Sequence, residues 1–317
     1  MPEVPKGHPA QSAMTMNLAA NMLGLDNAAT PLGIKAMQAL QQLNPTPSIA
    51  SNAQILFLVL NTSSVTLLPV TIFMYRAQAG SASATDVFLP ILFATSASTM
   101  AGLLAVAYVQ KIALWQPVVL AYLGSFILFM ASLMFGISHL STEMLSLYSS
   151  SAANIILLTF IVGVIGYAAY QKLETYELFV EGAKEGFSTA VTIIPYLVAM
   201  LIAIAALRAS GTLDVLIHLL AYCLHLSGLP SEFVDALPTG LMKPFSGSGA
   251  RAMMLESFST YGVDSFIGRM TSIMQGSTET TFYVLAVYFG SVGIRYGRHA
   301  VACGCLLYTS PSPRDRG

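Results

Sequence analysis

The apolar residues of this chain fall into long runs, and clusters of hydroxyl and amide side chains interrupt two of them. Residues 87–109, 114–137 and 152–170 form continuous runs, long enough to cross a bilayer as helices, which takes about 20 apolar residues. Residues 53–75 and 266–290 are also apolar, but they contain polar clusters. Unwound backbone at membrane depth is tolerated only where protein or a cavity satisfies it. These two runs are therefore predicted to be broken or re-entrant helices.

Further helices are predicted between these runs. Residues 189–207 form a span that Pro195 kinks, and residues 213–226 form a short span or an interfacial helix. Thr30 and Pro31 have the pattern of a helix start, which predicts an amphipathic helix from residue 31 to about residue 43. Residues 138–151 are predicted to be a Ser-rich link, and a helix is expected over residues 252–261. We expect about seven to nine membrane segments in total.

Composition supports the same architecture. The 317 residues are 55% hydrophobic and only 9% charged, whereas a soluble domain has roughly 25% charged residues. The chain is predicted to be an all-α integral membrane protein, a polytopic helical bundle with the lipid bilayer as its partner. Its net charge of −1 provides no basic field, so no nucleic-acid partner is expected. A homo-oligomer is compatible with this architecture.

The two polar clusters supply most of the candidate substrate-binding residues. A carboxylate at membrane depth needs a basic partner, a cation or a proton, so Glu279 indicates either proton- or cation-coupled binding or a buried ion pair with Arg251 or Arg269. The hydroxyl groups either line a site for a polar solute or bond to carbonyls of their own helices. The candidates in these clusters are Asn61, Thr62, Ser63, Ser64, Gln275, Ser277, Thr278, Glu279 and Thr280.

A second kind of candidate is the glycine-rich stretch at Ser246, Ser248 and Arg251, with Asn27 in a similar small-residue breaker. Amide groups at a helix start can bind an anion, and Arg251 would reinforce that site. A simple helix break is the alternative.

No enzyme, metal site or cofactor is predicted. His218 and His225 have no acidic or third ligand nearby, and Cys223, Cys303 and Cys305 form no metal-ligand pattern. No nucleophile is paired with a base. Glu256, Asp264 and Arg269 are expected in a solvated or interfacial loop.

The two halves of the chain are predicted to be one unit used twice. In each half a polar cluster follows, by roughly thirty residues, a small-residue breaker and an amphipathic helix. Interrupted helices in corresponding positions of two repeats surround the substrate site in secondary transporters. The predicted parts are a first repeat (1–112) that lacks an N-terminal arm, linking membrane helices (113–175), a second repeat (176–305) and a non-native tail (306–317). The chain is therefore expected to be a fragment.

These stretches resemble the spore maturation proteins A and B, here fused into one chain, which contain the nucleoside recognition or gate domain. Residues 21–31 and 61–64 resemble the A protein, and residues 181–187, 246–251 and 275–283 resemble the B protein. The resemblance implies a domain related to parts of nucleoside transporters and ferrous-iron permeases. In spore formers it implies a role in dehydration of the spore core. Asp26 departs from the family pattern, which usually has Gly there.

The predicted function is binding or transport of a small polar solute such as a nucleoside, in the bacterial cytoplasmic membrane, with a sporulation-related role. The alternative is a membrane scaffold or signalling partner that transports nothing. A structure with Glu279 and Asn61 facing a cavity favours transport, and one with both in dry helix contacts favours the scaffold.

Overall fold

The computed structural model describes residues 3–24, 26–63, 66–112, 116–184 and 233–305, together with scattered residues between 185 and 232. In these ranges the chain is helical, and its one β-bridge joins Ile49 to Tyr296. The helices are α1 (Pro9–Met22), α2 (Asp26–Gln41), α3 (Asn52–Ser63), α4 (Val70–Gln78), α5 (Phe88–Gln110), α6 (Pro117–Ser138), α7 (Thr142–Tyr170), the short η1 (Val234–Ala236), α10 (Leu237–Met242), α11 (Gly247–Tyr261), α12 (Phe266–Ser277), α13 (Thr281–Gly290) and α14 (Ala300–Cys305).

Three of the described helices are long and apolar enough to cross a membrane, at Phe88–Gln110, Val119–Gly136 and Glu143–Tyr170. They coincide with the three continuous apolar runs of the sequence. This confirms an all-α integral membrane protein. The predicted Ser-rich link is wrong in part, because α7 already begins at Thr142. Ser141 caps it by accepting a hydrogen bond from the Met144 amide, which is what a serine at the N-cap position does.

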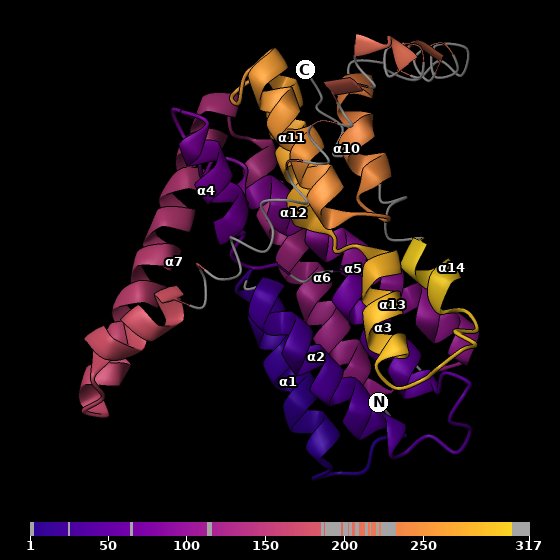
Figure 1. Cartoon of the computed structure of the whole chain (residues 1–317). Coiled ribbons are helices and arrows are strands. Elements are labelled where there is room, and N and C mark those ends of the chain that lie inside the picture. The colour runs from indigo at the N-terminus through magenta and orange to yellow at the C-terminus, as the bar shows by residue number, and fades with distance from the viewer. Residues whose placement is uncertain are drawn as a thin grey trace.

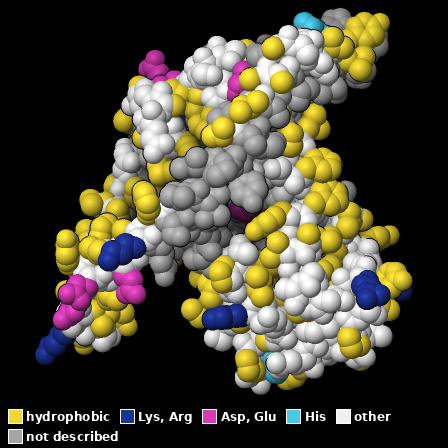
Figure 2. Space-filling model, viewed as in Figure 1, with side chains coloured by type: hydrophobic (Ala, Val, Ile, Leu, Met, Phe, Trp, Pro, Cys, Tyr) yellow, Lys and Arg dark blue, Asp and Glu magenta, His cyan; other side chains and the backbone are white. Residues whose placement is uncertain are grey.

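Helix α7 extends away from the other helices as an arm (Figure 1). In the apolar stretch of α7 only 6% of the residues are buried, and in that of α6 none are. In the apolar stretch of α5 the buried share is 33%. Apolar side chains cover the arm, and charged side chains gather toward its far end (Figure 2), where the chain continues through Lys172, Glu174 and Glu177. A helix that is apolar on all sides is stable only when other apolar groups cover it, so the exposed apolar surface of α6 and α7 is that of membrane-spanning helices.

The core joins the first half of the chain to the second. One cluster of buried side chains includes Met37 and Phe57 from α2 and α3 together with Tyr288 from α13. The rings of Phe57 and Tyr288 stack with centroids 6.0 Å apart. A second cluster brings Phe73 of α4 and Met254 of α11 together. The polar groups at the ends of α3, α4, α12 and α13 are therefore held by apolar packing from both halves.

Two predicted helix starts are wrong. Helix α2 begins at Asp26, so Pro31 lies inside it and does not start it. The packing of α2 against α1 begins before the proline, since Asn17 Nδ2 donates to the Ala29 carbonyl at 2.7 Å. Helix α11 begins at Gly247, five residues earlier than residue 252, because Ser246 is an effective N-cap.

Candidate functional site

Both polar clusters lie where a helix ends and another begins. Helix α3 ends at Ser63 before α4 starts at Val70, and α12 ends at Ser277 before α13 starts at Thr281. The two interruptions touch each other: the Glu279 amide donates a hydrogen bond to the Thr62 carbonyl at 2.8 Å. Segments far apart in the sequence thus meet at their helix breaks.

Neighbouring groups satisfy other backbone atoms at these breaks. The Met22 carbonyl accepts from the amides of Leu67 and Leu68, at 2.9 and 3.0 Å. The Gln275 carbonyl, in the last turn of α12, accepts from Lys243 Nζ at 2.9 Å. Unpaired carbonyls at a helix end need such partners when water is excluded. Lys243 therefore stabilises the open end of α12.

A pocket of about 60 Å³ lies between the two breaks. Lys243, Arg251 and Glu279 give it three charged side chains, of which Lys243 is only 4% exposed. The Arg251 guanidinium also lies 5.5 Å from the centre of the Tyr75 ring, which is a cation–π contact. The lining consists of Gly24, Thr66, Pro69, Thr71, Ile72, Lys243, Gly247, Arg251, Gln275, Gly276, Thr278 and Glu279.

Four predicted site residues come together in this pocket: Arg251, Gln275, Thr278 and Glu279. Gln275 is buried, and its Nε2 donates to the Gly247 carbonyl at 3.4 Å. Its Oε1 is buried without a hydrogen-bond partner, which is uncommon for a buried polar atom.

The residues predicted in the first break lie elsewhere. Asn61 is buried, and its Oδ1 accepts from Asn21 Nδ2 at 2.9 Å and from Tyr288 Oη at 3.2 Å. Its Nδ2 donates to the Phe57 carbonyl, one turn back in α3. Asn61 thus belongs to a buried polar cluster that ties α1, α3 and α13 together.

Thr62 and Ser63 are likewise buried, and their hydroxyls bond back to their own helix. Thr62 Oγ1 donates to the Leu58 carbonyl at 2.9 Å, and Ser63 Oγ donates to the Leu60 carbonyl at 2.8 Å. This is the alternative left open for such hydroxyls in the sequence. Thr62 still contacts the second break through its backbone carbonyl.

The stretch predicted as an amide nest or a helix break forms the start of α11. Ser246 Oγ accepts from the Gly249 amide at 3.0 Å and lies 3.2 Å from Ser248 Oγ. Gly247, the first residue of the helix, lines the pocket. The helix start is therefore in contact with the pocket, although Ser246 and Ser248 do not line it.

Of the remaining predicted residues, Ser277 Oγ donates to the Met274 carbonyl at 3.4 Å, and the Thr280 amide donates to Glu279 Oε2 at 3.4 Å. Neither side chain lines the pocket. Ser64, the side chain of Asn27 and the tail 306–317 lie outside the described residues.

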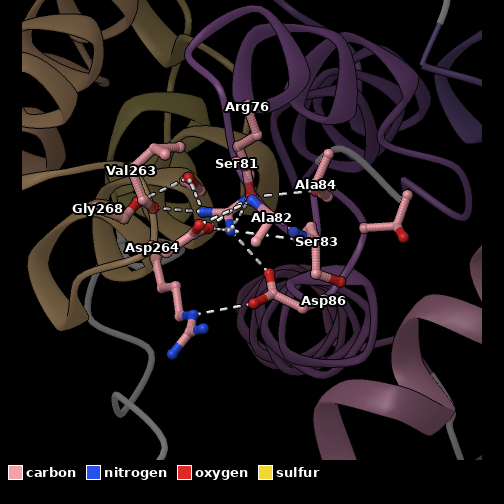
Figure 3. A network of polar contacts seen from close by, with 12 residues as sticks. Arg76, Ser81, Ala82, Ser83, Ala84, Asp86, Val263, Asp264 and Gly268 are labelled. Carbon is pink, nitrogen blue, oxygen red and sulfur yellow. Dashed lines mark hydrogen bonds and ion pairs between the residues drawn. The ribbon is translucent and has the colours of Figure 1, made fainter.

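A network of charged residues forms a second junction between the halves (Figure 3). Arg76, in the last turn of α4, is fully buried. Its Nη2 lies 2.9 Å from Asp86 Oδ1 and 3.0 Å from Asp264 Oδ1. Arg269 Nε contacts the other oxygen of Asp86 at 2.9 Å. Two arginines and two aspartates thus balance one another.

The other nitrogen atoms of the Arg76 guanidinium also donate hydrogen bonds. Its Nη1 donates to the Val263 carbonyl at 2.9 Å, and its Nε donates to the Ala84 carbonyl at 3.2 Å. A buried guanidinium is tolerated only when its donors are paired in this way.

Asp264 lies in the turn before α12, outside the three long apolar helices, and its side chain is 35% exposed. Partial burial would raise its pKa. The hydrogen bonds from Ser81 and Ala82 and the charge of Arg76 outweigh this effect, so the pKa of Asp264 is lowered. Of the three residues predicted to lie in a loop, only Asp264 lies in a turn, because Glu256 belongs to α11 and Arg269 to α12. The sequence did not indicate the ion pair of Asp264 with Arg76.

Lys243 was not among the predicted site residues. Its position between Pro238 and Pro244, in the segment between the two predicted helix breaks, could have indicated a polar role. The sequence prediction missed the polar lining at Thr66 and Thr71 as well. No group of three or more metal-ligating side chains occurs in the part of the chain that the structure describes. Cys303 and Cys305 are free thiols.

Comparison with known proteins identifies the domain that contains seven of the twelve residues lining this pocket. Residues 190–295 match the nucleoside recognition (Gate) family. This range includes Lys243, Arg251, Gln275 and Glu279, whereas the pocket residues from Gly24 to Ile72 lie outside it. No solved structure matches the chain.

Three curated relatives cover different parts of the chain. Spore maturation protein B of Bacillus subtilis (strain 168) is 49% identical over 146 residues, which is 46% of this chain and 80% of that protein. Spore maturation protein A of the same organism is 43% identical over 107 residues, 34% of this chain and 55% of that protein. Inner membrane protein YjiG of Escherichia coli (strain K12) is 32% identical over 89 residues, 28% of this chain and 58% of that protein.

The chain thus spans little more than half of protein A and of YjiG, but most of protein B. At 49% identity over 80% of protein B, it belongs to the spore maturation protein family that contains the nucleoside recognition domain.

Proposed function

We propose that this protein binds a small polar solute in the pocket between the two helix breaks and passes it across the bacterial cytoplasmic membrane. The observation that supports this most directly is the pocket itself, which both breaks line and which contains Lys243, Arg251 and Glu279. Transporters place their sites at such breaks, because helix ends offer polar groups within the membrane.

The names of the matched family and of the relatives also support a solute-binding membrane protein. The matched domain is described as nucleoside recognition, so a nucleoside-like solute is the first to test. The names of spore maturation proteins A and B favour a sporulation-related role, and the name of YjiG favours the inner membrane. The proposal involves no catalytic step. A homo-oligomer stays a prediction of the sequence.

The size of the pocket bears on the mechanism. At about 60 Å³ it is well below the roughly 300–1,000 Å³ of pockets for drug-sized ligands. A nucleoside would require the breaks to move apart. Transport of a nucleoside therefore implies a second, more open conformation, as alternating access requires.

The test is uptake by proteoliposomes that contain the purified full chain. Labelled uridine and a panel of small polar solutes are offered, with empty liposomes as the blank. Glu279→Gln is expected to lower the initial uptake rate about tenfold or more, because a bond to a charged group is lost from the pocket. Glu256→Gln is the matched control, since Glu256 lies on α11 outside the pocket lining. Absence of uptake for every solute would overturn the proposal.

A membrane scaffold is the second candidate, and one observation favours it. Asn61 lies in buried contacts with Asn21 and Tyr288 and does not line the pocket. The two residues therefore support different hypotheses. Glu279 lines a cavity, which favours binding, and Asn61 lies in buried helix contacts, which favours a structural role. Unaltered uptake in Glu279→Gln would favour the scaffold.

A further inference from the structure

The two ends of the helix bundle differ in charge, and the difference points to the lipids that one end meets. We propose that the end around Lys111, Arg295 and Arg298, which we call the basic end, faces the cytoplasm and binds the anionic phospholipid headgroups of that leaflet. This inference rests on the proposed location in the cytoplasmic membrane, but it does not depend on the pocket or on the transport of a solute.

Contacts between distant segments place these three cations together. Gln110, the last residue of α5, donates through Nε2 to the Asn52 carbonyl at 3.1 Å, and Lys111 follows it directly. Arg298 Nη1 donates to Asn52 Oδ1 at 3.0 Å, and the Arg295 amide donates to a carbonyl in the segment just before α3. The end of α5, the start of α3 and the turn before α14 therefore form one surface.

The cations of the basic end are exposed and lack carboxylate partners. Lys111, Arg295 and Arg298 are all exposed, and none of them forms an ion pair with a residue that the structure describes. Glu3 reaches the same end, where its Oε2 accepts from the Ala53 amide at 3.0 Å. On the visible lower part of the bundle Figure 2 shows Lys and Arg side chains and no carboxylate. Positive charge is therefore in excess at this end.

The opposite end has no such excess. Helix α5 has 23 residues and is about 35 Å long, which is close to the thickness of a bilayer. At its other end lies the network of Arg76, whose two arginines are paired with two aspartates. The link between α6 and α7, residues 139–141, contains neither lysine nor arginine. Helix α7 starts near the network, because Ser150 Oγ lies 2.6 Å from Ser83 Oγ.

The distribution of lysine and arginine sets the orientation. Cytoplasmic ends of membrane helices carry an excess of these residues, whereas carboxylates have little influence. Since α7 starts on the side of the network, it ends on the side of the basic end, where Lys172 follows it. Glu174 and Glu177 lie beside Lys172 in the sequence, but they carry little weight in this rule. The basic end is therefore assigned to the cytoplasm.

Exposed tyrosines mark the level of the lipid headgroups at the basic end. Tyr108, three residues before Lys111, is 87% exposed, and Tyr296, next to Arg295, is 67% exposed. Tyrosine gathers at the interface between acyl chains and water, because its ring is apolar and its hydroxyl is polar. Cations beside such tyrosines lie at the height of the lipid phosphates. Lysine and arginine at that height attract anionic lipids.

The orientation is tested by labelling the full chain in spheroplasts with a membrane-impermeant maleimide. Ser48→Cys places a thiol at the basic end, and Ser259→Cys places one near the end of α11, beside the network; both positions are exposed. Labelling is read above the background of the parent chain, which keeps its native cysteines. Ser259→Cys should react in intact spheroplasts, and Ser48→Cys only after permeabilisation. Reaction of Ser48→Cys in intact spheroplasts, or none of Ser259→Cys, would overturn the orientation.

Lipid binding is measured with the purified full chain in detergent, from the dependence of thermal unfolding on lipid concentration. Short-chain phosphatidylglycerol is the anionic probe, and phosphatidylcholine with the same acyl chains is the neutral one. The apparent affinity should be at least about tenfold higher for phosphatidylglycerol. It should fall about fivefold in Arg295→Gln, because one cation near an anionic surface contributes roughly that factor. Arg295→Lys keeps the charge and should keep the affinity.

Glycerol phosphate, the soluble part of the headgroup, separates a lipid from a free anion. It should not stabilise the protein at concentrations at which phosphatidylglycerol does. Equal stabilisation by the two would mean that the basic end binds a soluble anion. Equal affinity for the two lipids, or unchanged affinity in Arg295→Gln, would mean that these cations do not select the lipid. Each of these results overturns the proposal and leaves the proposed function, which uptake tests, as it stands.

Discussion

Two polar junctions join the halves of this protein, and they differ in how fully their groups are paired. Helix α4 has its first turn at the pocket and Arg76 in its last turn, whereas α12 has Arg269 in its first turn and its last turn at the pocket. At the Arg76 network two arginines meet two aspartates. At the pocket Gln275 Oε1 is buried and has no hydrogen-bond partner. A fully paired junction stabilises the fold, whereas an incompletely paired one is suited to a ligand.

The largest expected effect comes from the buried guanidinium. Arg76→Met should lower the free energy of unfolding by about 3–5 kcal/mol, because it leaves Asp86 and Asp264 without their shared counter-charge. Thermal unfolding in detergent measures this. Arg269→Met is the control in the same network: its side chain is 44% exposed, so a loss of about 0–1 kcal/mol is expected. Equal losses in the two variants would mean that burial does not set the strength of this network.

Replacing the buried carboxylate should have an intermediate effect. Asp86→Asn keeps the shape of the side chain but weakens two charge-assisted hydrogen bonds, to Arg76 and Arg269. We expect a loss of about 1.5–3 kcal/mol in unfolding free energy. Asp264→Asn should lose less, because that side chain is 35% exposed. The comparison of the two variants by thermal unfolding sharpens the contrast between buried and exposed members of one network.

Acid should affect the same network. The lowered pKa of Asp264 means that the folded protein holds this carboxylate ionised more strongly than the unfolded chain does. Its contribution to stability is therefore present above the unfolded pKa of about 4 and is lost as the pH falls through the folded pKa. Unfolding of the Asp264→Asn variant should depend less on pH in that range than unfolding of the parent chain.

The sequence predicts the features that depend on local composition. The spans at α5 to α7 follow from run length and hydropathy, and the helix breaks follow from hydroxyl clusters within apolar runs. Pairing across the chain is different. Nothing near Arg76 indicates that its partners include Asp264, and nothing near Asn61 indicates that Tyr288 will bond to it. These partners are chosen by tertiary packing, which also overrides the helix-start pattern at Pro31.

Each of the two junctions has a serine that caps a helix start. Ser246 caps α11 beside the pocket, and Ser265 caps α12 beside the network, each by accepting one amide at 3.0 Å. Ser246→Ala and Ser265→Ala should each lose about 1 kcal/mol of unfolding free energy. Only Ser246→Ala should also weaken solute binding, because it loosens the helix start that lines the pocket. Weakened binding in both variants would indicate a general effect of stability.

The smallest expected effect on stability is at Gln275. Gln275→Leu removes a buried acceptor that has no partner and loses one long bond to the Gly247 carbonyl. Removing an unsatisfied polar atom offsets the loss of that bond, so the free energy of unfolding should change by less than about 1 kcal/mol. Solute uptake by proteoliposomes should nevertheless fall about tenfold, because a polar group of the pocket lining is lost. A residue whose loss leaves stability unchanged but weakens uptake belongs to the site, and a large loss of stability without a change in uptake would place Gln275 with Arg76 among the structural groups.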